Sequence, residues 1–412
     1  MLYRLKDAGY EAYLVGGGVR DLLLGREPKD FDVATDAHPE QIKEVFRNCR
    51  LIGRRFRLAH VHFGREIIEV ATFRAQHNGD EDGGVTEDDG RIVRDNVYGT
   101  VEDDAVRRDF TVNALYYNIK DFSVVDYAGG VGDLEAGMLR LIGDPEVRYR
   151  EDAVRMLRAV RFAAKLGFRI HPEAEEPIFE LGHLLTDIAA ARLFEEVLKL
   201  FMGGSAVQTY ELLCHYNLLQ YLFPQTATAL EKDQNGIFHA LILRAMENTD
   251  VRIAAGKPVT PAFLYAVLMW MPMQRRAKEL RREGMTEVQS ICEAGGEVLA
   301  EQGRCVVFPK RFSLQTREIW QLQPRLKRTT GKGPLRLLGH PRFRAAYDFL
   351  LLRAEAGELH QELCDWWTEF QVENPDVIAQ AASRAAPKKR PRRRPRKKPF
   401  DAKPSGGSGE SA

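Results

Sequence analysis

Two aspartates separated by a single residue are the sharpest chemical signal in this sequence. Asp30 and Asp32 flank Phe31, and alternate side chains of a strand share one face, so both carboxylates are expected to project together while Phe31 and Val33 face the core. Carboxylates on one face repel each other unless a cation neutralises them, and a pair of Mg²⁺ ions about 3.5–4 Å apart is a common solution in phosphoryl chemistry. A DxD pair also occurs in many surface turns, so it indicates a metal site only together with other signals.

A run of three glycines precedes the aspartates. Gly16, Gly17 and Gly18 lie between an expected strand and an expected helix, where their backbone N–H groups could approach a triphosphate at the helix N-terminus. Arg20 would add a charged fork to phosphate oxygens. The alternative is a tight strand-to-helix turn without a ligand. The spacing does not fit GxGxxG, because Asp21 replaces the third glycine, and GxxxxGK[ST] does not occur.

Two further acidic residues are candidates for the same site. Glu69 lies in an apolar, strand-like run, where a carboxylate should face a cation or a polar cleft unless it is a surface residue of an edge strand. Asp109 follows Arg107 and Arg108, which suggests a phosphate or nucleotide environment. From the residues alone, the favoured role of Asp109 is to cap a helix over residues 111–117.

Length and composition limit the class of protein. A chain of 412 residues usually exceeds one hydrophobic core, so two or three domains are expected. No stretch approaches about 18 consecutive apolar residues and no secretory signal is present, so a transmembrane segment is not expected. The five cysteines are scattered without a CxxC pair, which predicts buried or free thiols in a reducing cytoplasm rather than a zinc ribbon or disulfides.

Charge is distributed unevenly along the chain. The net charge is +1, but residues 384–412 contain eleven Lys/Arg and two acidic residues, while the remainder contains 49 basic and 57 acidic residues. Such a split suggests that the basic tail binds nucleic acid. From residue 381 onward, repeated prolines and few apolar residues predict disorder.

The hydrophobic pattern divides the chain near residue 144. Before it, strands are expected over residues 13–15, 30–34, 57–62 and 66–72, helices over 19–24, 39–47 and 111–117, and an acidic surface loop over 77–90. After it, apolar residues recur at helical spacing, with helices over 154–166, 178–185, 193–201 and 209–219 and onward to residue 370. The four tryptophans are expected to fill helix contacts rather than to stack on bases: Trp270, Trp320, Trp366 and Trp367.

Several segments together resemble a known family, the class II nucleotidyltransferases, which include bacterial poly(A) polymerases and CCA-adding tRNA enzymes. The resemblance covers residues 9–201 as an ordered series of motifs. The motifs are LVGGGVRDLLLGREPKDFDVAT at 14–35, EVATFR at 69–74, RRDFTVNALYY at 107–117, DYAGGVGDL at 126–134, EDAVRMLRAVRFAAKLGF at 151–168 and ARLFEEVLKLF at 191–201. LIGRRFRLAH at 51–60 resembles the polymerase branch, as do residues 2–5, residues 342–348 and the basic tail. Relatives usually carry more sequence ahead of the glycine run.

The resemblance implies an α+β fold: a polymerase-β-like nucleotidyltransferase head with a mixed sheet, an all-helical neck and body, and a disordered basic tail. The implied domains are a catalytic head over 1–140, a neck with the nucleotide-selecting helix and RNA-binding helices over 141–203, an RNA-binding body over 204–380, and the tail over 381–412. The long CCA-adding relatives have an HD-type metal domain, and no His-Asp dipeptide occurs here.

The resemblance also assigns roles to residues of the site. Asp30 and Asp32 would hold two Mg²⁺ ions, Asp109 would be a further active-site acid, and Glu69 is our additional candidate. The nucleotide-binding set comprises Gly17, Gly18, Arg20, Arg108, Asp152, Arg155, Arg158 and Arg161. On an ideal helix Asp152 and Arg155 are about 60° apart, so one face would present an acceptor beside a donor fork to a base edge. The alternative is an ion pair with solvated arginines, and Arg161 would fall opposite Asp152.

The implied activity is template-independent transfer of AMP from ATP to RNA 3′ ends with release of pyrophosphate, which promotes RNA turnover. The expected partners are ATP and the 3′ ends of messenger and small RNAs, with RNA-decay machinery as an open candidate, and the chain is expected to be a cytoplasmic monomer. Tail residues expected to grip phosphates without reading sequence are Lys388, Lys389, Arg390, Arg392, Arg393, Arg394, Arg396, Lys397 and Lys398. Two alternatives stay open: a CCA-adding or A-adding tRNA enzyme, and an RNA-binding protein with an inactive site.

Overall fold

The N-terminal part of the chain forms a mixed β-sheet. The computed structural model describes residues 1–53, 57–75, 97–377 and 379. These residues build a seven-stranded sheet in the order β3-β4-β5-β2-β1-β6-β7, in which β2 and β5 pair in parallel and the other neighbours pair antiparallel. The strands are β1 (Ala12–Val15), β2 (Asp32–Thr35), β3 (Cys49–Ile52), β4 (Leu58–Phe63), β5 (Glu66–Thr72), β6 (Leu115–Asn118) and β7 (Val124–Asp126).

The strand expected over residues 30–34 begins later than predicted. β2 starts at Asp32, so Asp30 and Phe31 precede it, and Phe31 is 43% exposed. The expectation that Phe31 faces the core is therefore wrong, because the alternation of a strand does not extend to a residue outside it. Val33 is buried as expected, at 3% exposure. The other expected strands match β1, β4 and β5 within a residue or so.

Short helices connect and cover the strands. They are α1 (Leu2–Asp7), α2 (Gly17–Leu23), α3 (Pro39–Val45), α4 (Val101–Val106), the 3₁₀ helix η2 (Thr111–Asn113) and α5 (Gly130–Glu135). The helix expected over 111–117 is wrong. Only η2 is helical there, and the chain then enters β6, because Leu115, Tyr116 and Tyr117 pair between β1 and β7. Long-range pairing overrides the local helical spacing at this point.

From residue 145 onward all regular elements of the described chain are helices except for one two-residue strand. The helices are α6 (Pro145–Glu151), α7 (Val154–Leu166), α8 (Pro172–Leu181), η3 (Gly182–Asp187), α9 (Ala190–Phe201), α10 (Ala206–His215), α11 (Leu219–Leu222), α12 (Pro224–Glu231), α13 (Ile237–Ala254), α14 (Pro261–Leu268), α15 (Trp270–Arg282), α16 (Glu287–Cys305), α17 (Lys310–Leu326), α18 (Gly333–Leu338), α19 (Phe343–Glu355) and α20 (Gln361–Glu373). The exception is β9 (Arg169–Ile170), which pairs with β8 (Met138–Leu139). The helix expected over 209–219 is interrupted at Asn217, which has a φ of 55°.

One apolar core joins the sheet to the helices. It runs from Phe110 and Val112 beside the sheet, through α7 and α9, to Trp270 and Trp320. A separate cluster surrounds Trp367 between α17, α19 and α20. Three tryptophans are at most 1% exposed, and Trp366 packs against the second cluster, so the expectation of helix contacts is confirmed.

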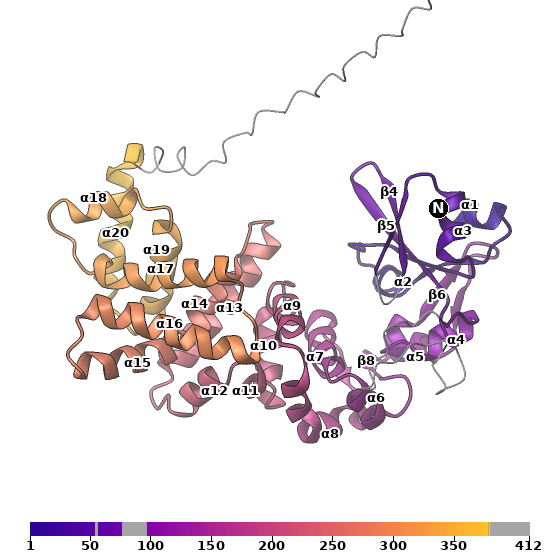
Figure 1. The fold of residues 1–412 in the computed structure, drawn as a ribbon, viewed down its shortest axis with the longest axis horizontal. Coiled ribbons are helices and arrows are strands. Elements are labelled where there is room, and N and C mark those ends of the chain that lie inside the picture. Colours follow the sequence, from indigo (N-terminus) through magenta and orange to yellow (C-terminus); the bar gives the residue numbers. More distant parts are fainter. Residues whose placement is uncertain (54–56, 76–96, 378, 380–412) are drawn as a thin grey trace, which may run out of the picture.

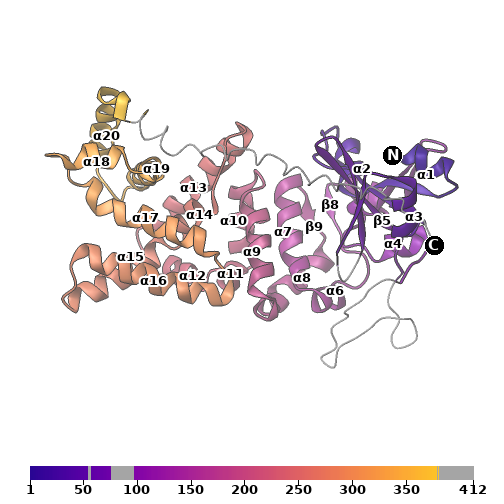
Figure 2. The same ribbon diagram turned by 45° about the horizontal axis from the view of Figure 1, so that its top comes forward.

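The molecule is elongated, with the sheet at one end and the helices following it in a row (Figure 1). A view turned by 45° shows the same order, with α6 to α9 next to the sheet and α15 to α20 at the far end (Figure 2). All five cysteines are free thiols. None of the described helices combines the length and apolar character that a bilayer crossing requires. The expected acidic loop at 77–90, part of the segment 51–60, and the basic tail lie outside the described residues.

Candidate active site

The glycine run forms a tight turn against the aspartate segment. Gly16 has a φ of 74°, in the region that favours glycine, and α2 begins at Gly17. A Cβ on Gly18 would lie 3.4 Å from the carbonyl oxygen of Asp30 and 3.5 Å from a ring carbon of Phe31. The start of α2 thus lies in close contact with the residues that enter β2.

The two aspartates lie in one cavity with this turn. Asp30, Asp32 and Gly16–Gly18 line a cavity of about 520 Å³ between the sheet and the helices. Asp32 is directly opposite Glu69 in the pairing of β2 with β5. Desolvation by the surrounding protein, together with repulsion from Glu69 and Asp30, raises the pKa of Asp32, and Arg108 only partly opposes this. Asp30 and Asp32 therefore bring negative charge to the cavity, and Glu69 adds repulsion on Asp32 from the neighbouring strand.

Glu69 is neither in the cavity lining nor on an edge strand. β5 lies between β4 and β2, and half of the Glu69 side chain is exposed. Its carboxylate lies 3.0 Å from His60 Nε2. In the part of the chain that the structure describes, no three His, Cys, Asp or Glu side chains converge as a ready-made metal cluster. The role of Glu69 as a ligand therefore remains a proposal, with less geometric support than that of Asp30 and Asp32.

Arg20 is a buried residue of the cavity wall. Its guanidinium is 2% exposed and donates to Asp21 Oδ1 from Nε at 2.8 Å and from Nη2 at 2.5 Å. Nη1 donates to Asn113 Oδ1 at 2.5 Å. These bonds use three of its five N–H groups, so Arg20 is held in place by protein and has two N–H groups left for a ligand.

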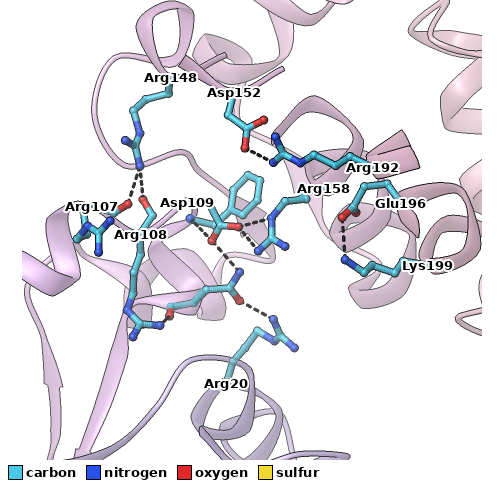
Figure 3. Close-up of polar contacts among 12 residues, drawn as sticks. Arg20, Arg107, Arg108, Asp109, Arg148, Asp152, Arg158, Arg192, Glu196 and Lys199 are labelled. Atoms are coloured by element: carbon cyan, nitrogen blue, oxygen red, sulfur yellow. Dashed lines mark hydrogen bonds and ion pairs between the residues drawn. The ribbon is translucent and has the colours of Figure 1, made fainter. Parts of the chain in front are cut away.

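Asp109 connects the segment after α4 to the helical part of the molecule. Its Oδ2 accepts two hydrogen bonds from Arg158 on α7, one of them from Nε at 2.7 Å (Figure 3). Its Oδ1 accepts from Asn113 Nδ2 at 3.2 Å and from the backbone N–H of Phe110 at 2.9 Å. Burial opposes ionisation, but Arg158 and these donors lower the pKa of Asp109 below its usual value. The favoured helix-capping role is wrong, because the expected helix does not form.

A second arginine of the helices holds the same segment by its backbone. Arg148 on α6 is buried, and its Nη2 donates to the carbonyl oxygens of Arg107 and Arg108 at 2.8 Å each (Figure 3). The side chain of Arg108 turns toward Asp104 and Tyr116, with Nη2 2.9 Å from Asp104 Oδ2. Arg108 also lines the cavity. The Arg107–Asp109 segment is therefore fixed by α6 and α7.

The expected Asp152–Arg155 helix face is not present. Asp152 ends α6 in an extended conformation, with φ −155° and ψ 97°, and α7 begins only at Val154. Its Oδ2 accepts from Arg192 on α9 at 2.6 Å (Figure 3), whereas Arg155 donates to Glu151 at 2.8 Å. The ideal-helix argument fails because a break between two helices separates the two residues. Neither residue belongs to the cavity lining.

Another face of α7 supplies the cations of the cavity. Arg158, Arg161 and Lys165 all line it, at spacings of three and four residues that share one helix face. The ring of Phe162 lies under the guanidinium carbons of Arg20, Arg158 and Arg161, at 5.4, 5.4 and 4.5 Å. Burial and the neighbouring Arg158 lower the pKa of Arg161. No carboxylate within the described ranges forms an ion pair with Arg161.

Comparisons with known proteins identify the family. A family model described as "Poly A polymerase head domain" matches residues 12–140, and models described as "Probable RNA and SrmB-binding site of polymerase A" and "Polymerase A arginine-rich C-terminus" match residues 167–230 and 283–399. The chain is 54% identical to poly(A) polymerase I of Escherichia coli over 382 residues, which cover 91% of this chain and 82% of the relative. The chain belongs to the poly(A) polymerase family.

Other relatives agree with this placement. Poly(A) polymerase I of Haemophilus influenzae is 49% identical over 376 residues, which cover 90% of this chain and 83% of the relative. Among solved structures, the Bacillus stearothermophilus CCA-adding enzyme in complex with CTP is similar with a TM-score of 0.59 and 26% identity, covering 89% of this chain and 80% of that chain. The CCA-adding enzyme thus shares the fold at about half the sequence identity of the poly(A) polymerases.

Several cavity residues of this poly(A) polymerase were not anticipated from the sequence. They are Asp21, Lys29, Asn113, Lys165, Lys199 and Ser205. Lys165 follows Arg158 by seven residues, so helical periodicity could have revealed it. Asn113 lies inside the RRDFTVNALYY motif, but its bonds to Arg20 and Asp109 depend on contacts between distant segments. Lys199 could not have been found from local spacing, because α9 meets the cavity only through the packing of the helices.

The charges of the cavity fit a nucleoside triphosphate with divalent cations. Carboxylates lie at the glycine turn, while Arg161, Lys165 and Lys199 line the helical side. Burial lowers the pKa of Lys165, partly offset by Asp21, whose Oδ2 lies 3.5 Å from Nζ. The placement of Asp30 and Asp32 in one cavity, with Glu69 opposite Asp32 on the neighbouring strand, favours a cation at the carboxylates, because a bound divalent ion would offset their repulsion.

Proposed function

We propose that this chain is a template-independent poly(A) polymerase that transfers AMP from ATP to RNA 3′ ends and releases pyrophosphate. One observation carries the chemistry: the carboxylates of Asp30 and Asp32 and the cations of α7 line the same cavity beside the glycine turn. Sequence identity of 54% to a relative named poly(A) polymerase I supports the choice of substrate. We propose that the adenylate tail added to the RNA 3′ end promotes turnover of that RNA.

The residues divide into two groups around the α-phosphate of ATP. Asp30 and Asp32 would hold Mg²⁺, with two ions expected, and Glu69 is an outer candidate. Bound Mg²⁺ would supply charge neutralisation at the phosphates and lower the pKa of the attacking 3′-hydroxyl. The N–H groups of Gly17 and Gly18, the free N–H groups of Arg20, and the cations of α7 would orient the triphosphate for in-line attack.

Asp109 acts in this proposal as a positioning residue. Its carboxylate is already occupied by Arg158, Asn113 and the N–H of Phe110, so it is placed to hold Arg158 at the cavity rather than to bind a metal. Arg108, Arg158 and Arg161 are the proposed nucleotide contacts that line the cavity. Roles for Asp152 and Arg155 in reading the base rest on the resemblance alone, and they require the pairs with Arg192 and Glu151 to open.

The proposed organisation follows the same scheme: a catalytic head over 1–140, a neck over 141–203, a body over 204–380 and a basic tail over 381–412. The tail arginines and lysines would bind RNA phosphates. We propose that the chain works as a monomer in the cytoplasm, where its five free thiols fit a reducing environment. The family description of an RNA and SrmB-binding site at residues 167–230 makes a component of RNA metabolism a candidate partner.

The function is tested by offering each of the four nucleoside triphosphates with Mg²⁺ to two primers. One primer is an unstructured RNA and the other is a tRNA that lacks its terminal nucleotides. We expect long ladders from ATP alone on the unstructured RNA. Addition that stops after CCA on the tRNA would instead identify a CCA-adding enzyme, and RNA binding without any nucleotide transfer would identify an inactive RNA-binding protein.

A further inference from the structure

A second cavity lies on the other side of the C-terminal turn of α9. Its volume is about 240 Å³, and its walls come from the end of α9, from α13, from α14 and the segment before it, and from α19 and the two residues before it. The two views place α9, α13 and α14 together in the middle of the molecule (Figures 1 and 2). Neither the proposed catalytic chemistry nor the nucleotide-binding set uses this cavity.

One residue is common to the second cavity and the active site. Met202, the C-terminal capping residue of α9, lines both cavities, while Gly203 and Ser205 line only the active-site side. The turn is anchored by Asp250 of α13, which accepts hydrogen bonds from the backbone N–H groups of Ala206 and Val207 at 2.7 and 3.2 Å. The two cavities are therefore neighbours across a fixed turn.

The lining of the second cavity combines cations with apolar surface. Arg252, Arg342 and Arg344 contribute guanidinium groups, and Asp348 contributes one carboxylate. Arg344 pairs with Asp348 at 2.8 Å, and Arg342 pairs with Glu318 at 3.1 Å. Arg252 donates only to the carbonyl oxygen of Pro258, at 3.1 Å. No carboxylate in the described chain lies within ion-pair distance of Arg252.

The apolar part is suited to the flat face of a base. Phe263, Val259, Pro341 and Ala345 line the cavity beside the polar side chains of Asn248 and Thr249. Phe263 is only partly buried, although it packs on the main core. An aromatic surface beside cationic side chains, one of which, Arg252, forms no ion pair within the described chain, is a combination with which proteins hold single-stranded nucleic acid.

A third, smaller cavity adjoins the second one. Its volume is about 150 Å³, and it shares Asn248, Arg252, Arg344 and Asp348 with the second cavity. Met202 and then the Arg252–Arg344 group thus connect three cavities in sequence, beginning at Asp30 and Asp32. An RNA strand whose 3′ end lies at the carboxylates has a lined route here for the nucleotides that precede it.

We propose that the second cavity is a subsite for an upstream nucleotide of the RNA primer. The base packs against Phe263 and Pro341, and the adjoining phosphates lie on Arg252 and Arg344. This inference rests on the proposed function, because it requires an RNA 3′ end in the active site. It adds a site that holds the primer without contacting ATP.

The first test compares Arg252→Glu with Arg244→Glu. Both residues are on α13, but Arg244 is exposed and paired with Glu247, outside these cavities. We expect Arg252→Glu to raise the KM for a long oligoadenylate primer about tenfold, since a charge-assisted contact is replaced by repulsion. The KM for ATP should stay unchanged, and the slope of log affinity against log salt should flatten by about 0.7 for each lost phosphate contact. Equal primer KM values for both variants would overturn the proposal.

Primer length separates this subsite from the catalytic chemistry. A primer too short to reach beyond Met202 should be extended equally by wild type and Arg252→Glu, whereas longer primers should show the defect. If the wild-type chain extends no RNA at all, the proposed function fails and the KM comparison does not arise. Thermal unfolding of both variants checks that the substitution leaves the fold intact.

Cross-linking provides a second measurement in the unmodified chain. Primers with a single photoreactive thiouridine at successive positions from the 3′ end are irradiated on the wild-type protein, and the linked peptides are mapped. We expect an upstream position to attach to the segments 245–264 or 341–348. Attachment of every upstream position elsewhere would overturn the subsite, even if polymerisation itself is efficient.

Discussion

Asp32 lines the cavity close to two other carboxylates, those of Asp30 and Glu69. Its pKa is raised by desolvation, by Glu69 across the β2–β5 pair and by Asp30. An acid in this position binds a cation well because the ion removes repulsion as well as forming ligand bonds. The repulsion among these carboxylates therefore favours binding of a divalent cation, which would neutralise it.

We predict that Asp30→Ala and Asp32→Ala each abolish nucleotide transfer, because each removes a proposed metal ligand. RNA binding should remain nearly unchanged, since the proposed primer contacts lie elsewhere. Transfer is measured with ATP and Mg²⁺, and binding with a labelled RNA in the absence of ATP. Asp7→Ala, an exposed substitution on α1, is the control. Activity that survives both cavity substitutions would contradict the metal assignment.

The Asp109 carboxylate differs from that of Asp32, because it already forms an ion pair with Arg158. Asp109→Asn should lower the free energy of unfolding by roughly 2–3 kcal/mol at pH 7, since Arg158 loses its partner while the bonds to Asn113 and Phe110 can remain. Chemical denaturation with a chelator present measures this difference.

The sign of the pH dependence follows from the lowered pKa of Asp109. A carboxyl group whose pKa is lower in the folded state contributes stability above its unfolded value of about 4, and loses it as the pH falls through the folded value. The difference between wild type and Asp109→Asn should be constant from about pH 8 to 5 and narrow below about pH 4. A difference that grows on acidification would contradict the ion pair.

At the scale of elements, the sequence predicted the bounds of a helix or strand correctly where the hydrophobic pattern lies within that element alone. β5 and α7 have the bounds expected from the sequence, because an apolar run and a helical stripe are contained within each. The prediction of a helix over residues 111–117 was wrong because Tyr116 and Tyr117 pair with β1 and β7 and so belong to β6. The predicted Asp152–Arg155 face is absent because the two residues do not share one helix: α6 ends at Glu151 and α7 begins at Val154.

The sequence predicted which types of residue form the site, but only some of the contacts between them. The glycine run, Asp30, Asp32, Arg158 and Arg161 all reach the cavity as the motif order implied. The bond between Asp109 and Arg158 joins residues 49 positions apart, and spacing along the chain carries no information about it. The cations that α9 brings to the cavity depend in the same way on how whole helices pack.

Helix α5 offers a test of how tightly these elements are joined. A Cβ on Gly130 would collide with the backbone carbonyl of Thr111 in η2, while a Cβ on Gly132 would meet nothing within 4 Å. Gly130→Ala should therefore destabilise the protein by roughly 1–3 kcal/mol. Gly132→Ala, at an exposed position of the same helix, should stabilise the protein by about 0.5–1 kcal/mol. Urea unfolding of both variants measures the two signs, and equal effects would contradict the packing of α5 on η2.

For the whole molecule, the basic tail and the mildly acidic remainder of the chain, residues 1–383, define separate contributions to RNA binding. Deleting residues 384–412, which include eleven Lys/Arg, should weaken RNA binding. The slope of log affinity against log salt should flatten by roughly 2–5 units as tail phosphate contacts are lost. Titrations at several salt concentrations measure this slope for both chains. An unchanged slope would assign the tail to solubility.

The grip of α6 and α7 on the segment Arg107–Asp109 has a mechanical consequence. Arg148 holds the segment by two backbone carbonyls, and Arg158 holds it by a carboxylate. Because these two attachments are at different points of the segment, the segment cannot turn freely about either of them. Any swing of the sheet relative to the long row of helices must then either break these bonds or leave residues 107–109 attached to the helices.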